Sequence, residues 1–383
     1  MERIPYGRQH ITDEDIQEVV KVLKADYLTQ GPKIAEFEKA FADYIGVNYA
    51  VAVANGTAAL HLSALTLGIN RNSRVITTPI TFIASANCVI YCGGQIDFVD
   101  IDEHTFLLDL DKLEEKLALK PPGYYQGVIP VDFAGLPLNT EYLYNLAKKY
   151  NFWILEDSCH APGGYFNNSN SEKVFCGNGK YADLSIFSFH PVKHIATGEG
   201  GMITTNNEKF YNKLQLYRIH GVTKQPELME ENHGGWYYEM QELGFNYRLT
   251  EISGALGISQ LKNADKRLER RIQIAEKYDR AFKDTSIITQ HSPKHFANAY
   301  HLYIILVNNR LELYNELRKY NIHTQVHYIP VHLQPFYKKL GWKAGDFPVA
   351  ESYYNRCLSL PMYPSLSDEE QQYVIDKTLQ IVK

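Results

Sequence analysis

Hydrophobic residues in the first two thirds of the chain occur in short runs that alternate with amphipathic segments. Several runs are apolar almost throughout, which is typical of strands buried on both faces of a parallel sheet. The predicted strands cover 49–54, 74–79, 95–101, 127–133, 152–157, 183–189 and 201–205. Helical patterns lie between many of them, most clearly at 57–67, 109–117 and 139–150. Strands alternating with helices predict a doubly wound α/β domain.

The pattern changes near Thr250. Residues 250–282 have apolar side chains at helical spacing and predict one long helix that links two lobes. Strand-like runs follow at 299–307 and 322–329, and helical signals resume after Ser367. We therefore predict a large domain over 1–262 and a smaller α+β domain over 263–383. The polar stretch 166–180 predicts an exposed loop insertion.

Composition narrows the class of protein. The chain has 383 residues with a net charge of −5, so it lacks the basic surplus that non-specific nucleic-acid binding needs. No apolar run approaches the ~18 residues of a membrane span, and the first residues do not resemble a signal peptide. Five cysteines form an odd, sparse set that fits a reducing compartment. We expect a cytoplasmic protein that binds neither membrane nor nucleic acid.

Two histidines near the C-terminus, His323 and His327, have the HxxxH spacing that suits zinc on a helix. The residues around them are β-branched and aromatic, which favours a strand. On a strand these two side chains would lie about 13 Å apart, at ~3.3 Å per residue, and could not share an ion. We therefore predict no metal site.

Chemistry is expected where strands end, because ligands of open α/β sheets bind at the carboxyl ends of the strands. The first predicted strand is followed by Asn55, Gly56, Thr57 and Ala58, and a helix begins at once. Free N–H groups and the helix dipole make such a turn a phosphate site. An ordinary glycine turn with an N-capping residue explains the same pattern.

Two adjacent acids, Glu156 and Asp157, close the strand at 152–157, and one of them must point away from the other. Asp157 is a candidate partner for a cationic ring nitrogen, although helix capping or a surface position is the competing interpretation. His160 follows three residues later and is close enough to contact the same ring.

The segment after the strand at 183–189 places Lys193 between two histidines and before a glycine-rich turn. A lysine in such a setting is desolvated, which lowers its pKa and frees its amine as a nucleophile. The competing interpretation is a solvated surface charge.

Together these groups match the needs of pyridoxal 5'-phosphate (PLP). That cofactor takes a lysine for its Schiff base, an acid for its ring nitrogen and a cradle for its phosphate. Phe82, after the strand at 74–79, can stack on the ring, and Ser188 can add a phosphate contact. No GxGxxG or GxxxxGK[ST] motif is present, so neither a nicotinamide site nor a P-loop is supported.

At these residues the sequence resembles the DegT/DnrJ/EryC1/StrS family of sugar-nucleotide aminotransferases. The resemblance covers nearly the whole chain, and the segments Ser188–Lys193 and Gly198–Gly201 are its most specific parts. Further matching segments are 28–32, 55–60, 78–82, 131–135, 156–160, 218–221, 244–248 and 327–328.

The resemblance implies a fold-type-I PLP enzyme with a mixed, mostly parallel seven-stranded sheet. It also implies a homodimer with shared active sites. By motif, Lys193 would bond to the cofactor and Asp157 would pair with its ring nitrogen. The other implied cofactor-binding residues are Thr57, Ala58 and Ser188 at the phosphate, Phe82 and His160 at the ring, and Asn246 and Arg248 from the other subunit. The implied substrate-binding residues are Tyr6, Thr29, Gly31, His220, His327 and Tyr328.

Within the family, the segments 28–31 and 325–330 look most like the pseudaminic-acid branch. That branch implies transfer of an amino group from L-glutamate to C4 of a UDP-linked 4-keto-6-deoxy-N-acetylhexosamine. A 3- or 4-keto sugar linked to dTDP or GDP is the alternative substrate. Dehydratases of the family carry histidine where this chain has Lys193, which argues against that reaction. A non-catalytic regulatory relative is a further, less favoured alternative.

Overall fold

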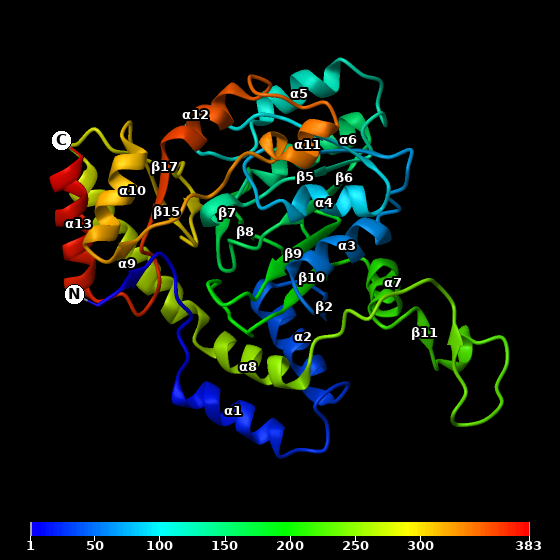
Figure 1. The fold of residues 1–383 in the computed structure, drawn as a ribbon. Coiled ribbons are helices and arrows are strands. Elements are labelled where there is room, and N and C mark those ends of the chain that lie inside the picture. The colour runs from blue at the N-terminus through cyan, green and yellow to red at the C-terminus, as the bar shows by residue number, and fades with distance from the viewer. Residues whose placement is uncertain (1, 383) are drawn as a thin grey trace.

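A seven-stranded sheet forms the centre of the larger part of the molecule (Figure 1). The computed structural model describes residues 2–382. In spatial order the strands are β2 (Tyr49–Val53), β10 (Gly201–Thr205), β9 (Leu184–Ser188), β6 (Trp153–Asp157), β5 (Gly127–Ile129), β3 (Arg74–Thr77) and β4 (Gln95–Phe98). Each lies within a predicted run, so the strand predictions and the mixed, mostly parallel α/β sheet are confirmed.

The direction of the strands determines at which edge of the sheet a ligand can bind. β10 is antiparallel to both of its neighbours, β2 and β9, whereas all other neighbouring strands are parallel. Six strands therefore point the same way, and their carboxyl ends share one edge of the sheet. The turns that follow β2, β3, β5, β6 and β9 all lie at this edge, which is where ligands of open α/β sheets bind.

Helices cover this sheet and include the three that the pattern predicted most clearly. Those three are α3 (Gly56–Thr66), α5 (Leu110–Ala118) and α6 (Thr140–Tyr150). The others in this part are α1 (Asp13–Leu23), α2 (Pro32–Ile45), α4 (Ala84–Tyr91), α7 (Glu208–Arg218) and α8 (Glu251–Lys262). Rings of Phe41 on α2 and Phe187 on β9 pack edge to face with centroids 4.9 Å apart, which fixes α2 against the strand that leads to Lys193.

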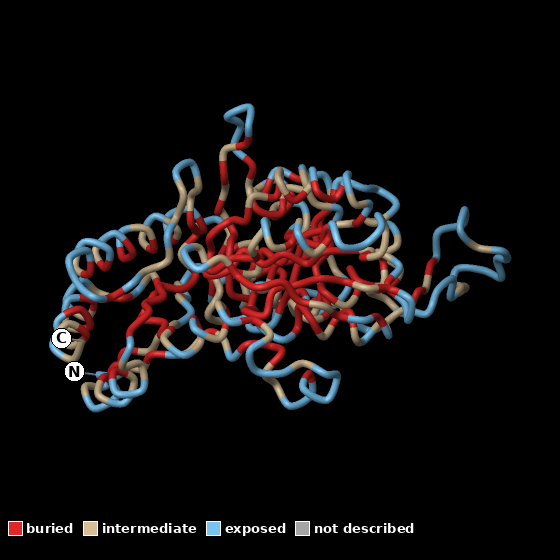
Figure 2. The backbone as a smooth tube through the Cα atoms, turned by 90° about the horizontal axis from the view of Figure 1, so that it is seen from above, coloured by how far each residue is buried: buried red, intermediate tan, exposed pale blue. Residues whose placement is uncertain are grey.

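The C-terminal part has its own buried core, visible beside the larger one in Figure 2. Its sheet contains β13 (Ile288–Thr289), β15 (Tyr303–Leu306) and β17 (Cys357–Leu360), and its helices are α9 (Ala264–Phe282), α10 (Arg310–Lys319) and α13 (Asp368–Ile381). β1 (Ile4–Pro5) pairs with β16 (Ile322–His323), so the N-terminus joins this part. The helices α11 (Pro335–Lys339) and α12 (Pro348–Arg356) contribute Tyr337 and Tyr353 to the larger core.

The single helix predicted over 250–282 is wrong. The structure has α8 (Glu251–Lys262) and α9, separated at Asn263. Asn263 has φ −109° and ψ 14°, outside the helical range, and it caps one helix while starting the next. The break coincides with the predicted domain boundary. Helical spacing of apolar residues continues across the break, which is why the pattern did not reveal it.

The exposed loop predicted over 166–180 is also wrong in its first half. Residues there form a hairpin of β7 (Tyr165–Asn167) and β8 (Lys173–Phe175), joined by β14 (Phe296–Ala297) from the C-terminal part. Phe166 and Val174 are buried. The Asn168 side chain accepts hydrogen bonds from the N–H groups of Asn170 and Glu172 and so builds the turn. Its polar turn residues made the hairpin look like a loop.

The strand predicted over 322–329 ends after His323. Beyond one bridge between Gln325 and Ser359 the chain leaves the sheet and turns toward the larger part. The strand geometry used to separate His323 from His327 therefore does not apply. Within residues 2–382, neither histidine belongs to a group of three side chains that could hold a metal ion.

An extended arm protrudes from the larger part, at the right of Figures 1 and 2. It carries β11 (Val222–Thr223), the 3₁₀ helix η2 (Pro226–Leu228) and β12 (Glu239–Met240). Large apolar side chains on and after the arm are exposed, with Trp236 at 76% and Leu243 at 78%. The other 3₁₀ helices are η1 (Phe133–Gly135) and η3 (Val331–Leu333).

Two expectations from composition can be compared with the part of the chain that the structure describes. Across residues 2–382 there is no helix whose length and apolar character would suit a membrane crossing. All five cysteines are free thiols.

The N-terminus of α13 gives a test of the fold. Ser367 accepts a hydrogen bond from the Glu370 N–H at 3.1 Å, and the Glu370 carboxylate accepts one from the Ser367 N–H at 2.9 Å, which completes a capping box. Ser367→Ala should lower the free energy of unfolding by about 1 kcal/mol in denaturant titration. Ser365→Ala, at an exposed position two residues away, is the control. Equal stabilities for the two variants would contradict the capping role.

Candidate active site

A cavity of about 440 Å³ opens at the carboxyl edge of the sheet. This is within the range of small-molecule and cofactor sites. Residues from the turns after β2, β3, β5, β6 and β9 line it, together with side chains of the C-terminal part. The lining residues proposed from sequence are Tyr6, Thr57, Phe82, Asp157, His160, Ser188, Lys193, His327 and Tyr328.

One end of the cavity is the N-terminus of α3. Gly56 approaches Ser188 so closely that a Cβ atom at position 56 would lie 3.1 Å from the Ser188 Cβ. The Asn55 side chain accepts a hydrogen bond from the Ala58 N–H at 2.8 Å. The Ala58 N–H is therefore engaged in capping the helix, and the first-turn groups left for an anion are those of Gly56 and Thr57.

Asp157 lies deeper in the cavity. Its Oδ2 accepts a hydrogen bond from the Ser85 hydroxyl at 2.7 Å, and its Oδ1 accepts one from the Cys159 N–H at 3.2 Å. The Ser85 hydroxyl also meets the Thr81 hydroxyl at 2.8 Å. These contacts fix the direction of the carboxylate. Glu156 points to the other side of β6, where Ser185 and Gly177 donate to it, as the sequence requires of adjacent strand residues.

Lys193 is half-buried and lines the same cavity as Asp157. Burial lowers the pKa of its amine, and Cys159 and Asp157 partly offset this effect. Loss of hydration favours the neutral, nucleophilic form of the amine. Lys193 and Asp157 thus line one cavity, and the carboxylate is near enough to raise the pKa of the amine.

His160 is held in one tautomer. The Ala134 N–H donates a hydrogen bond to His160 Nδ1 at 3.2 Å, so Nδ1 must be the acceptor and Nε2 carries the proton of the neutral ring. Nε2 lies 3.4 Å from the Tyr328 hydroxyl. Burial lowers the pKa of His160 well below its usual value, and the nearby Lys193 lowers it further. His160 is therefore a neutral donor in the cavity.

Aromatic side chains form the remaining walls. Phe82 stands at the mouth, 56% exposed, with its ring centroid 6.2 Å from that of Tyr328. His327 meets the Ser359 hydroxyl at 2.8 Å through Nδ1, and its ring lies 5.1 Å from that of Tyr6. Burial, followed by the charge of Lys193, lowers the pKa of His327 to about 3.

Sequence reasoning missed several groups at this site. His301 lines the cavity and packs against His160, with ring centroids 4.3 Å apart and the rings tilted by 41°, yet it arrives from the C-terminal part. Ser85 and Ala134 orient Asp157 and His160, respectively. Only a tertiary contact reveals these partners, because none of them belongs to a motif that carries chemistry alone.

Other residues assigned from sequence do not line this cavity: Thr29, Gly31, Ala58, His220, Asn246 and Arg248. The Gly31 N–H donates to Glu251 at 2.9 Å at the start of α2. Asn246 is exposed and forms an isolated bridge with Ile219 near the base of the arm. Within this chain, these residues therefore lie away from the cavity.

The residues at the cavity fit PLP. An amine with a lowered pKa and a carboxylate fixed by two donors share one cavity, while a helix N-terminus and the Ser188 hydroxyl converge at its end. At Gly56 a side chain would crowd Ser188, so the glycine lets the backbone of the turn approach the Ser188 hydroxyl closely. The donors suit an anion at one end, and the carboxylate suits a cationic ring nitrogen at the other.

Comparison with known proteins gives consistent relatives along the whole chain. The DegT/DnrJ/EryC1/StrS aminotransferase family matches residues 9–379. A Campylobacter jejuni protein named UDP-4-amino-4,6-dideoxy-N-acetyl-beta-L-altrosamine transaminase is 38% identical over 388 residues, covering 99% of this chain and 98% of that protein. The Bacillus subtilis spore coat polysaccharide biosynthesis protein SpsC is also 38% identical, over 99% of this chain and 97% of that protein.

Solved structures agree with these relatives. Helicobacter pylori PseC, described as an aminotransferase involved in the biosynthesis of pseudoaminic acid, superposes with a TM-score of 0.88 at 32% identity. That match covers 100% of this chain and 99% of PseC. The sugar aminotransferase Spr1654 of Streptococcus pneumoniae, in its form with pyridoxamine phosphate (PMP), has a TM-score of 0.90 at 30% identity, over 99% of both chains. A second Spr1654 structure is the PLP form.

The burial of Lys193 predicts its titration in cofactor-free protein. The pH dependence of amine labelling at Lys193, followed by peptide mass spectrometry, should give a midpoint below the ordinary 10.5 because burial disfavours the charged form. Asp157→Asn should lower the midpoint further, because the carboxylate raises the pKa of the amine. A midpoint at or above 10.5 in the wild type, or an upward shift in the variant, would contradict this electrostatic account.

Proposed function

Because the chain belongs to the DegT/DnrJ/EryC1/StrS aminotransferase family, and is thus a PLP-dependent sugar aminotransferase, we propose that it transfers an amino group from L-glutamate to C4 of a UDP-linked 4-keto-6-deoxy-N-acetylhexosamine. The observation that carries the reaction type is the presence of Lys193, Asp157 and the α3 N-terminus in one cavity. The substrate rests on the relatives in Campylobacter jejuni and Helicobacter pylori named as altrosamine transaminases. This reaction belongs to pseudaminic-acid biosynthesis.

Several residues would hold the cofactor. Bound PLP supplies an electron-withdrawing ring that stabilises negative charge on the carbon beside the reacting nitrogen. The N–H groups of Gly56 and Thr57 and the Ser188 hydroxyl would bind its phosphate. Asp157 would pair with the ring nitrogen and keep it protonated, and Phe82 would cover one face.

Lys193 has two roles in this scheme. Its amine would hold the cofactor, and once free it would take and return a proton at Nζ as general base and acid. The lowered pKa suits this work, because a neutral amine can accept a proton without first losing one. Three neutral imidazoles surround this amine, those of His160, His301 and His327, and burial lowers the pKa of each. They can orient polar groups without competing for the proton.

The mouth of the cavity would receive the sugar. Tyr6, His327 and Tyr328 line it beside Phe82, and the Nε2–H of His160 is directed toward the Tyr328 hydroxyl. Neutral hydroxyl and imidazole groups suit the hydroxyls and the ketone of a hexose. We assign these residues to substrate positioning.

We further propose a homodimer in which each cavity is completed by the partner. Asn246 and Arg248 lie outside the cavity of their own subunit. Trp236 and Leu243, which precede them in the sequence, are large exposed apolar side chains. Exposed apolar groups of this size commonly mark a protein interface. In the dimer Asn246 and Arg248 would reach the phosphate of the other site, and Thr29, Gly31 and His220 would serve its substrate.

A panel of keto-sugar nucleotides tests the substrate. Incubation with L-glutamate and PLP should give an amino sugar from the UDP-linked 4-keto-6-deoxy-N-acetylhexosamine, at a kcat/KM at least about tenfold above that for dTDP- or GDP-linked ketosugars, as expected if one extra specific contact is made. The measurement is product formation by mass spectrometry.

Lys193→Ala is the control and should form no product with any sugar, because the proton carrier is lost. Turnover of dTDP- or GDP-sugars alone would overturn the UDP assignment and leave an aminotransferase. The relative named GDP-perosamine synthase, 32% identical, makes a GDP-sugar the most informative competitor. Full turnover in Lys193→Ala would overturn the mechanism itself.

A further inference from the structure

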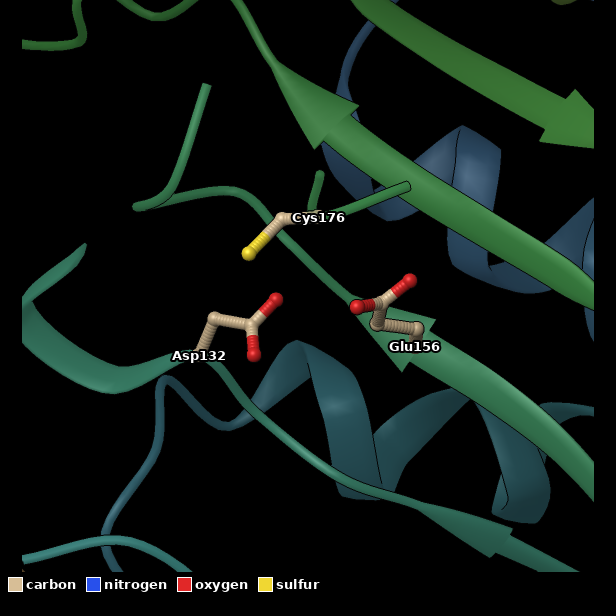
Figure 3. A group of neighbouring side chains, drawn as sticks. All are labelled: Asp132, Glu156 and Cys176. Carbon is tan, nitrogen blue, oxygen red and sulfur yellow. The ribbon is translucent and has the colours of Figure 1, made fainter. Parts of the chain in front are cut away.

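Behind the cavity, three titratable side chains converge in the protein interior (Figure 3). Asp132 follows β5, Glu156 belongs to β6 and Cys176 follows β8, and their side chains point toward one another. All three are buried, and one ligand atom from each lies within 4.8 Å of the others. Two negative charges at this distance, away from water, repel each other strongly, so ionising both carboxyl groups together costs much free energy.

Hydrogen-bond donors surround Asp132. Its Oδ1 accepts from the Leu138 N–H at 2.8 Å, and its Oδ2 accepts from the Ser158 hydroxyl at 2.8 Å. The Cys176 thiol also forms a hydrogen bond to it. Since these partners donate, Asp132 has the surroundings of a carboxylate.

Glu156 has a different arrangement. The Gly177 N–H at 2.9 Å and the Ser185 hydroxyl at 2.7 Å both donate to the same oxygen, Oε2. Its side chain also forms a hydrogen bond with Asp132. The donors on Oε2 leave Oε1 as the atom that can carry a proton toward Asp132.

We propose that Glu156 and Asp132 share one proton, held on Glu156, and that the anionic Asp132 positions the active-site turn that carries Asp157 and His160. This inference depends on PLP binding and not on the identity of the sugar. It names two positioning residues that do not line the catalytic cavity.

The connection from Asp132 to the cavity is short. Through Ser158 it holds the turn that follows β6, between Asp157 and His160. Through Leu138 it holds the turn that contains Ala134, whose N–H fixes the tautomer of His160. Ala134 has a φ of +64°, a left-handed conformation that is strained for a residue with a side chain, and the hydrogen bond from Leu138 to Asp132 helps to hold this turn.

The directions of the pKa shifts of these side chains agree with this geometry. Burial raises the pKa of Asp132 to about 6, and burial followed by the charge of Asp132 raises the pKa of Glu156 well above its usual value. Asp157 is the further charged group that raises the pKa of Asp132. Burial, Asp132 and Glu156 raise the pKa of the Cys176 thiol, which therefore stays protonated and donates. The proton accordingly resides on Glu156.

Isosteric amides give an asymmetric test. In Glu156→Gln the amide N–H₂ replaces the carboxylic O–H, so the PLP dissociation constant and kcat/KM should stay within about threefold of wild type. In Asp132→Asn the new amide N–H₂ group faces groups that themselves donate hydrogen bonds. A buried donor is then left without an acceptor, so PLP should bind about tenfold or more weakly. PLP titration of apo protein, thermal unfolding and infrared spectroscopy are the measurements.

The infrared spectrum detects the proton on the carboxyl group and does not depend on enzyme activity. Wild type should show the C=O band of a protonated buried carboxylic acid, and Glu156→Gln should lose it. That comparison tests whether the pair holds a proton even if Asp132→Asn does not fold. Tolerance of Asp132→Asn with loss in Glu156→Gln would mean that the proton is on Asp132. If both variants behave like wild type, the two carboxyl groups serve only to fill the interior. Loss in both, with a stoichiometric metal in purified protein, would mean a metal site. Each of these three outcomes overturns the proposal.

Discussion

The direction of six strands is the constraint on which the rest of the structure depends. Because β2, β3, β4, β5, β6 and β9 all run the same way, the turns after five of them meet at one edge of the sheet. β10 runs in the opposite direction, so it begins at that edge, and its first residue, Gly201, lies against Asn55. Asn55 and Lys193, 138 positions apart in sequence, thereby share one cavity.

Electrostatics within that cavity follows from burial. The amine of Lys193 loses hydration and gains a carboxylate neighbour, whereas the imidazoles around it lose hydration and face a positive charge. Both effects disfavour protonated histidine. The site therefore combines an amine of lowered pKa with neutral imidazoles. In the roles proposed above, the amine carries the proton, and Asp132 and Glu156 behind β6 hold the turn beside His160.

Much of this arrangement was readable from the sequence, and the exceptions have physical reasons. The central strands were predictable because apolar runs bounded by turn residues are typical of buried parallel strands. The break at Asn263 was hidden because the apolar periodicity continues through it. The β7–β8 hairpin was hidden because the Asn168 turn consists of residues typical of loops. At the site, Lys193 and Asp157 were found from their strand-end positions, whereas His301 was not, since it arrives from the other part of the chain. Ala58 was assigned to the phosphate, but its N–H caps α3.

The central claim is that the amine of Lys193 is the attachment point of PLP. Borohydride reduction of the purified holoenzyme, followed by proteolysis and mass spectrometry, tests it most directly. The account predicts that the pyridoxyl group is found on the peptide containing Lys193 and on no other lysine, at about one group per subunit, as a single site requires. Reduction that leaves Lys193 unmodified, or that labels another of the lysines, would contradict it.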